Sequence, residues 1–301
     1  MKNNDTSKNT FDVIIIGGGP AGLSAAIYSA RAGKATLVLE RLACGGQINM
    51  ISDIQNYPGN ANIDGIVLAQ NMLGQAEGFG ARIEYDAAVR IEARTAAGAH
   101  KVYTASGAVY AAPSVIVATG ARAKKLGLER EDELTGAGVS YCATCDGNFF
   151  RGRDVAVAGG GKKAVEEALY LAALCRKVYI VSARPPAAPA PELEKLKAAS
   201  NVEHIAGAIT ALEGMPLSGV TLDSGRRLDV SGLFVAVGTQ SETALLKDSG
   251  LALDAKGFVV TDGGLKTNVA GIFAAGDVRS GSARQIVTAC AEGATAAMSV
   301  T

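Results

Sequence analysis

The chain has 301 residues, 48% of them hydrophobic, and its 29 lysines and arginines balance its 29 aspartates and glutamates. This length allows about two domains, and the balanced charge provides no overall field to attract nucleic acid or an anionic membrane. The first ten residues are polar, and no apolar run reaches the roughly 18 residues of a membrane span. Five scattered cysteines do not make a secreted disulfide framework. We therefore expect a cytoplasmic protein with no nucleic acid or membrane partner.

The first predicted strand covers residues 11–16 and runs into a glycine turn, Gly17-Gly18-Gly19-Pro20-Ala21-Gly22. A helix is expected from Ala21 to Ala32, and a second strand ends at Glu40. Strand, turn, helix, strand and acid in this order predict a dinucleotide site, because glycines let the backbone approach a pyrophosphate at a helix N-terminus. Glu40 is expected to accept hydrogen bonds from the ribose hydroxyls. The alternative is a glycine turn needed only for packing.

Loops are predicted at Cys44-Gly45-Gly46-Gln47 and Asn56-Tyr57-Pro58-Gly59, and a helix at 65–78. Strands are expected near residues 82–91 and 101–110. An apolar strand at 114–117 ends in the small-residue turn Ala118-Thr119-Gly120, which is suited to lie against a cofactor. Residues 122–133 are charged and are interpreted as a linker.

Two cysteines separated by two residues, Cys142 and Cys145, are followed directly by Asp146. Such a pair can form a redox-active disulfide, and the aspartate can move a proton when a sulfur leaves or is attacked. The alternative is half of a structural zinc site, which needs four ligands. We predict no metal because the remaining cysteines and the two histidines are scattered: Cys44, Cys175, Cys290, His100 and His204.

The architecture then repeats. A strand at 154–158 leads into a second glycine turn, residues 159–164, with the pattern G-x-G-x-x-A. A helix from Val165 to Cys175 and a strand at 177–181 follow, and residues 233–238 echo 115–120. Two copies of one nucleotide-binding layout indicate an internal duplication. Near the C-terminus, an apolar strand ends in Gly276-Asp277, and Arg284-Gln285 precede a helix at 286–298.

Taken together, these motifs resemble the low-molecular-weight thioredoxin reductases, from about residue 11 to residue 298. The resemblance is carried by Gly17–Gly22, Gly45–Gln47, Asn56–Gly59, Ala118–Gly120, Cys142–Asp146, and Gly276–Val278 with Arg284-Gln285. It implies an α/β fold of two Rossmann-like dinucleotide-binding domains, each of three ββα layers, with the second inserted in the first. An FAD-binding domain would comprise 1–122 and 246–301. A central NAD(P)H-binding-like domain, 123–245, would carry the redox pair.

The resemblance also implies a flavoprotein disulfide oxidoreductase that forms a homodimer and reduces thioredoxin. Cys145 would face the flavin and exchange electrons with it, Cys142 would attack the disulfide of thioredoxin, and Asp146 would act as acid and base. The residues expected to bind FAD are Gly17, Gly19, Pro20, Ala21, Gly22, Glu40, Gly46, Gln47, Asn56, Ala118, Thr119, Gly120, Gly276, Asp277, Arg284 and Gln285.

The second nucleotide site departs from the family pattern. Family members bind NADPH at the second glycine turn, here Gly159, Gly161 and Ala164, and grip its 2′-phosphate with His-Arg-Arg and a further Arg. This chain has Ser-Ala-Arg-Pro-Pro-Ala-Ala at residues 182–188, so only Arg184 remains. A charge-assisted hydrogen bond contributes about 1.5–3 kcal/mol, so losing two weakens binding by about 100-fold or more. We expect weak NADPH binding and an atypical electron donor, with ferredoxin as the leading hypothesis.

Several alternatives remain open. The enzyme is either such an atypical reductase, an ordinary NADPH-dependent thioredoxin reductase, or a dithiol oxidase that passes electrons to oxygen; a non-enzymatic redox sensor is a further alternative. Lys162 and Lys163 in the second glycine turn are either offset by Glu166 and Glu167, or meet a phosphate or an acidic protein. Cys44 is either a third redox centre or an inert core residue. The remaining cysteines are expected to be packing residues and both histidines surface residues.

Overall fold

The computed structural model describes residues 9–51, 53–94 and 98–300. The described chain forms two compact units. One runs to Arg122 and resumes at Ser241, and the other covers Ala123–Gln240. The boundary predicted after residue 245 therefore lies five residues beyond the one observed. Two short strands at the crossings, β8 (Ala121–Ala123) and β17 (Thr239–Ser241), pair with each other.

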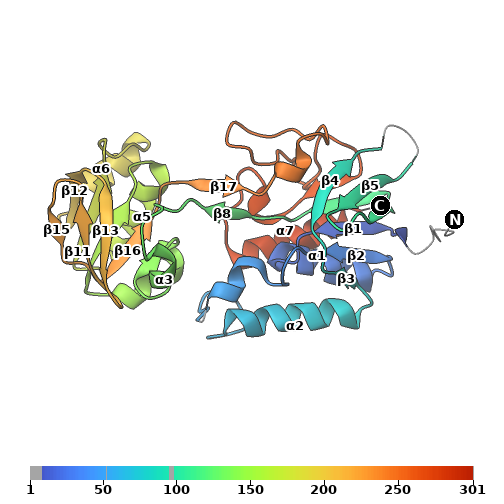
Figure 1. Cartoon of the computed structure of the whole chain (residues 1–301), viewed down its shortest axis with the longest axis horizontal. Coiled ribbons are helices and arrows are strands. Elements are labelled where there is room, and N and C mark those ends of the chain that lie inside the picture. Colours follow the sequence, from blue (N-terminus) through green and yellow to red (C-terminus); the bar gives the residue numbers. More distant parts are fainter. Residues whose placement is uncertain (1–8, 52, 95–97, 301) are drawn as a thin grey trace. The chain divides into compact units, whose positions relative to one another are not determined.

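The first unit is built on a five-stranded parallel sheet in the order β18-β7-β1-β2-β3 (Figure 1). Its central strand β1 (Val13–Ile16) is buried at every position, as expected for an apolar run covered on both faces. Val13 pairs with Thr36 on one side and with Ser114 on the other. The remaining strands are β2 (Thr36–Leu39), β3 (Arg82–Glu84), β7 (Ser114–Val117) and β18 (Ile272–Ala274).

Alternate residues of β1 enter two different cores. Val13 and Ile15 pack with the helices on one face, and Ile14 and Ile16 pack with an antiparallel sheet on the other. The helices are α1 (Pro20–Arg31), α2 (Gly65–Gly78) and α7 (Ile286–Met298), and the antiparallel strands are β4 (Ala88–Glu92), β5 (His100–Thr104) and β6 (Val109–Ala112). This arrangement confirms the three ββα layers.

The second unit repeats the plan. Its parallel sheet has the order β12-β11-β10-β16-β9. These strands are β9 (Val139–Ser140), β10 (Asp154–Ala158), β11 (Lys177–Ser182), β12 (Val202–Ala206) and β16 (Gly232–Val235). One face packs on α5 (Lys162–Ala172), near α6 (Ala190–Ala198), and the other on the antiparallel strands β13 (Ile209–Gly214), β14 (Leu217–Leu222) and β15 (Arg227–Leu228). Two short helices, α3 (Glu131–Leu134) and α4 (Ala143–Asp146), complete the unit.

Several expectations were wrong in detail, and the strand expected at 101–110 is two strands, β5 and β6. Helix α5 begins at Lys162 rather than Val165, so both lysines of the second glycine turn are helical. Residues 82–91 form two strands in different sheets, and the stretch interpreted as a linker contains α3. His100 is fully buried, where its Nδ1 accepts a 3.1 Å hydrogen bond from Arg94 N, whereas His204 is exposed as expected.

Among the described residues, no helix is long and apolar enough to span a bilayer.

Candidate active site

The redox pair is joined as a disulfide between Cys142 and Cys145. Cys142 lies in extended backbone two residues after the end of β9 and is the N-cap of α4, and its carbonyl accepts hydrogen bonds from Cys145 N and Asp146 N. A single helical turn therefore places the two sulfurs within bonding distance, with their Cα atoms 5.3 Å apart. Both cysteines are half-buried, which leaves them open to a reaction partner.

Asp146 is bound to the strand that leads into the pair. Ser140 Oγ donates a 2.5 Å hydrogen bond to Asp146 Oδ2 and accepts one of 3.1 Å from Cys142 N. Burial raises the pKa of Asp146, and the hydrogen bond from Ser140 lowers it again. A carboxyl group with a raised pKa can hold a proton nearer to neutral pH, as an acid in thiol–disulfide exchange requires.

The first glycine turn forms a cradle for a dinucleotide. Gly17 has φ of 108°, and a Cβ on it would overlap the carbonyl of Ala118, so the turn packs directly on the end of β7. A Cβ on Gly19, in contrast, would meet no atom within 4 Å. Gly19 is the N-cap of α1 and Pro20 follows it, so no cap side chain covers the helix N-terminus. This open backbone fits a pyrophosphate.

The other residues expected to bind FAD gather around this turn. Gly45 N donates to Gly18 O at 2.7 Å, and a Cβ on Gly46 would lie 3.5 Å from Gly19 Cα. Ala21 lies against Gly276, where a Cβ would come within 2.8 Å of the alanine methyl. The structure therefore brings the turns at 45–47, 118–120 and 276–277 to one edge of the parallel sheet, the edge at which ligands bind in such folds.

Three of these side chains already have partners within the protein. Glu40 accepts hydrogen bonds from Gly18 N at 2.7 Å and Leu42 N at 2.9 Å, so it holds the glycine turn in place. Gln47 Nε2 donates to Ala121 O at 2.6 Å, and Thr119 Oγ1 to Glu242 O at 2.7 Å. These bonds fix the loops that flank the cradle.

At the carboxyl end of β18, burial raises the pKa of Asp277 to about 6, while Arg284 lowers it and Glu292 raises it. Arg284 has φ of 55°, and its guanidinium lies 4.9 Å from the centre of the Phe258 ring. Gln285 caps α7 in a capping box with Thr288, and its Oε1 accepts from Asn56 Nδ2 at 3.2 Å. A side-chain hydrogen bond therefore joins the loop at Asn56 to the start of α7.

The second glycine turn lies between β10 and α5. Gly161 is the N-cap of α5, and Ala164 is buried. Ala187 N donates a 2.7 Å hydrogen bond to Gly160 O, so the proline-rich loop is attached to the turn. Arg184 is exposed, and its carbonyl accepts from Ser182 Oγ at 2.8 Å. His204 Nε2 lies 3.1 Å from the same hydroxyl, a neighbour that no local motif indicated.

The two lysines of this turn have acidic partners one helical turn later. Lys162 Nζ lies 3.4 Å from Glu166 Oε1, and Lys163 Nζ lies 3.4 Å from Glu167 Oε1. Lys163 also donates a 3.1 Å hydrogen bond to Tyr141 O. The structure thus agrees with the alternative in which both charges are offset within the protein.

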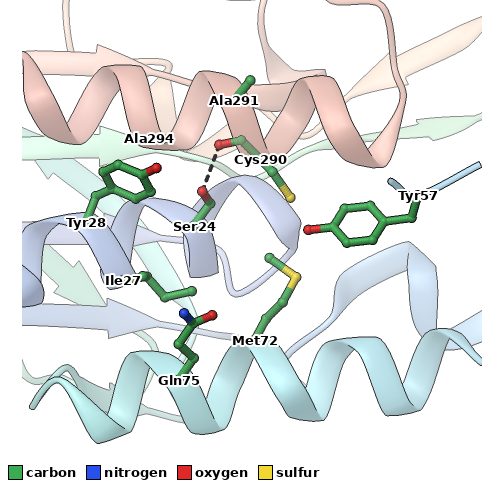
Figure 2. A pocket seen from close by; sticks show the side chains of 9 residues that line it. All are labelled: Ser24, Ile27, Tyr28, Tyr57, Met72, Gln75, Cys290, Ala291 and Ala294. Carbon is green, nitrogen blue, oxygen red and sulfur yellow. Dashed lines mark hydrogen bonds between the residues drawn. The ribbon is translucent and has the colours of Figure 1, made fainter. Parts of the chain in front are cut away.

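The remaining cysteines are poor candidates for redox chemistry. Burial raises the pKa of Cys44 and of Cys175 to about 11 each. Cys290 lines a cavity of about 290 Å³ between α1, α2 and α7, with its sulfur pointing toward the Tyr57 hydroxyl (Figure 2). Burial raises the pKa of Cys290 as well. Within the described part of the chain, no cluster of three or more His, Cys, Asp or Glu side chains could hold a metal ion.

Known proteins are similar to this chain in both sequence and fold. The pyridine nucleotide-disulphide oxidoreductase family model matches residues 11–293. A thioredoxin reductase of Helicobacter pylori is 42% identical over 305 residues, which cover 96% of this chain and 97% of that protein. The crystal structure of thioredoxin reductase from Streptococcus pyogenes matches with a TM-score of 0.90 at 38% identity, covering 97% of each chain. Thioredoxin reductase from Giardia duodenalis gives 0.91 at 34% identity, over 97% and 98% of the two chains.

This chain belongs to the low-molecular-weight thioredoxin reductase family. Like the members of that family, it is an FAD-dependent flavoprotein disulfide oxidoreductase, and the open cradle at Gly19 fits this cofactor. The family resemblance found the redox pair and the residues around the glycine turn. It did not indicate the contacts that Ser140, Lys163 and Glu167 make with the redox segment, residues 140–146. Lys163 reaches Tyr141 across 22 positions of sequence, whereas Ser140 contacts Cys142 and Asp146 within the segment. Only the unusual lysine at position 163 was a signal.

Proposed function

We propose that the protein is a thioredoxin-disulfide reductase in which two electrons pass from FAD through Cys145 and Cys142 to thioredoxin. The observation that carries this proposal is the disulfide between Cys142 and Cys145, with Asp146 hydrogen-bonded to Ser140 beside it. The cradle around Gly17 and Gly19 supports FAD binding in the first unit. Bound FAD supplies a carrier that takes up electrons from a donor and delivers them as a pair to the disulfide.

The two cysteines then have different tasks. The Cys142 thiolate attacks a sulfur of the thioredoxin disulfide, which forms a mixed disulfide and releases one thioredoxin thiolate. The Cys145 thiolate attacks Cys142, which breaks the mixed disulfide and releases the second. Asp146 gives up and recovers the proton that accompanies these steps. Two electrons and two protons thus leave the enzyme dithiol and appear as the thioredoxin dithiol.

The electron donor is the finer part of the proposal. We infer a protein donor of the ferredoxin class rather than NADPH. Arg184 alone remains of the phosphate-binding group, and Lys162 and Lys163 are engaged by Glu166 and Glu167. A one-electron donor needs a docking surface rather than a nucleotide clamp. Two reduced ferredoxins supply one electron each, and solvent supplies the two protons that complete the dithiol.

Anaerobic reduction of the flavin tests the donor. The holoenzyme is mixed separately with NADPH, NADH and reduced ferredoxin, and the loss of flavin absorbance is followed, with thioredoxin then added as acceptor. We expect rapid bleaching and thioredoxin reduction with ferredoxin, and slow bleaching with either nucleotide. Fast bleaching by micromolar NADPH would instead identify an ordinary NADPH-dependent thioredoxin reductase. Peroxide release from small dithiols without turnover of thioredoxin would identify a dithiol oxidase.

We also propose a homodimer that works in the reducing cytosol. Exposed apolar side chains on the first unit, Met50, Ile66 and Val67, support a surface that a second copy covers. Light scattering of the purified holoenzyme tests this, with a mass near twice 30.6 kDa expected.

A further inference from the structure

Lys163 and Glu167 contact the chain on both sides of Cys142. Lys163 Nζ donates to the carbonyl of Tyr141, the residue before Cys142, at 3.1 Å. Glu167 Oε1 lies 3.4 Å from the same Nζ, and the backbone amide of Ala143, the residue after Cys142, is one of the groups that lower the pKa of Glu167. The side chains of Lys163 and Glu167 are 36% and 9% exposed, so the glutamate is largely desolvated whereas the lysine stays partly exposed. Burial raises the pKa of Glu167, and Lys163 is the strongest influence lowering it.

The neighbouring pair makes no such contact. Lys162 lies 3.4 Å from Glu166, and their side chains are 59% and 52% exposed. Pairs of this kind on a helix surface contribute only about 0.3–0.5 kcal/mol. The two lysines lie in the same helical turn and carry the same charge, yet of the two only Lys163 contacts the redox segment. They therefore form a matched comparison.

The redox segment, residues 140–146, consists of short elements held by a small set of hydrogen bonds. Strand β9 has two residues and α4 has four. Reduction removes the covalent link between Cys142 and Cys145, which leaves the backbone bonds to Cys142 O and the hydrogen bonds of Ser140 Oγ with Cys142 N and Asp146 Oδ2. Tyr141 is also held at its hydroxyl, which donates a 2.8 Å hydrogen bond to Glu131 Oε1. The carbonyl of Tyr141 is held by Lys163, so this residue is fixed at both ends.

We propose that Lys163 and Glu167 are positioning residues that keep Cys142 in disulfide-forming geometry after the pair is reduced. This proposal rests on the proposed function only in taking the pair to be redox-active. Two thiols held at a fixed spacing close more readily than two mobile ones, because less conformational entropy is lost on closure. Closure converts two thiols into one disulfide and passes two electrons and two protons to an acceptor disulfide. The contacts of Lys163 and Glu167 therefore make the dithiol a stronger reductant.

The test compares Lys163→Met/Glu167→Gln with Lys162→Met/Glu166→Gln. Each double variant removes one lysine–glutamate pair without leaving an unpaired buried charge. The holoenzymes are equilibrated anaerobically with mixtures of reduced and oxidised dithiothreitol, and the redox state of Cys142 and Cys145 is read by alkylation and mass spectrometry. The buffer supplies the electrons, so the result does not depend on the natural donor.

We expect the 163/167 variant to hold about tenfold more dithiol than the wild type in the same buffer, equivalent to about 30 mV for a two-electron couple. The 162/166 variant stays within twofold of the wild type. With thioredoxin, kcat falls in the 163/167 variant while KM changes little, because the two residues act on the reactivity of the dithiol. Lys163→Arg restores the wild-type equilibrium, because the guanidinium retains a donor for the Tyr141 carbonyl.

A wild-type equilibrium in the 163/167 variant overturns the proposal, and equal shifts in both double variants overturn it too, because charge alone would then explain the effect. Thermal unfolding establishes that each variant is folded. If the 163/167 variant does not fold, Lys163→Met alone gives the same comparison, since Glu167 can take up a proton. Failure of the proposed function is seen separately, as a wild-type enzyme that does not reduce thioredoxin.

Discussion

The hydroxyl of Ser140 joins the two functional groups of the redox segment, because it donates to Asp146 Oδ2 at 2.5 Å while accepting from Cys142 N at 3.1 Å. The residue lies at the end of β9 and is 4% exposed. One buried hydroxyl thus sets both the position of the cysteine backbone and the proton affinity of the acid. Its loss should therefore change the pH dependence of the reaction as well as its rate.

Ser140→Ala tests this link. The hydrogen bond from Ser140 lowers the pKa of Asp146 against the effect of burial, so its removal raises that pKa further. We expect the limb of the kcat profile that reports Asp146 to move to higher pH and kcat to fall by about tenfold, less than the roughly 10²–10⁴-fold of a whole general acid–base contribution, because Asp146 itself is retained. The pH profile with thioredoxin measures this. Asp146→Asn should abolish the same limb, and an unshifted limb in Ser140→Ala would contradict the assignment.

Alanine substitutions at two glycines of the first turn should have different effects, one on stability and the other on flavin binding. A Cβ on Gly22 would overlap the carbonyl of Gly17, so Gly22→Ala should destabilise the apoprotein by several kcal/mol through overpacking. Gly19→Ala has no neighbour within 4 Å and an allowed φ of −76°, so the apoprotein should keep its stability. Its new methyl group would instead enter the space assigned to the pyrophosphate. We expect flavin affinity to fall at least tenfold, measured by titration of apoprotein with FAD. A Gly19→Ala protein that keeps full affinity would place the pyrophosphate elsewhere.

Asp277 should show a conflict between stability and cofactor binding. Its pKa is raised by burial to about 6, above the value of 3.8 for a free side chain. The folded state thus binds more protons between these two pH values, so stability falls as pH rises from about 4 to about 6 and stays reduced above. Asp277→Asn removes this penalty and should stabilise the apoprotein at pH 8 by up to about 3 kcal/mol, at 1.36 kcal/mol per pH unit.

Urea unfolding of apoprotein at pH 8 and pH 4.5 measures the effect, and the gain should shrink at the lower pH. The same substitution should weaken FAD binding if the carboxylate is a ligand of the cofactor. A variant less stable than the wild type at pH 8 would show that the carboxylate is needed for the fold itself.

The three remaining cysteines should be dispensable. Cys290 lines a cavity between α1, α2 and α7, and burial raises the pKa of its thiol (Figure 2). We expect Cys44→Ser and Cys290→Ser to reduce thioredoxin within twofold of the wild-type rate, whereas Cys142→Ser is inactive. Brief alkylation of the reduced native protein, read by mass spectrometry, should label Cys142 first. Rapid labelling of Cys44 would revive its role as a third redox centre.

The sequence predicted those features whose cause is local. The apolar run at 13–16 forms the central strand, and the helices at 65–78 and 286–298 have the predicted bounds. The start of α5 was missed because two lysines at a helix N-terminus oppose the helix dipole, and Glu166 and Glu167, one turn later, offset them. His100 was misplaced because its partner is the backbone of Arg94, which a sequence pattern does not reveal. Lys163 and His204 make contacts across 22 positions of sequence that only the folded sheet creates, whereas the contacts of Ser140 are local and no motif marks them.

The inference about the electron donor can be tested by restoring the nucleotide-binding residues. Restoring the family pattern with Ser182→His, Ala183→Arg and Ala188→Arg should rebuild the grip on a 2′-phosphate next to Arg184. Each charge-assisted bond contributes about 1.5–3 kcal/mol, so two new ones should raise NADPH affinity by about 100-fold or more. NADH lacks the 2′-phosphate, so its affinity should stay unchanged, and the ratio of the two constants isolates the designed contact. Fluorescence titration of the holoenzyme measures both affinities.

A wild-type protein that already prefers NADPH to NADH by such a factor would show that Arg184, with its neighbour His204, suffices to bind the 2′-phosphate. The proposal of a ferredoxin-class donor would then lose its support.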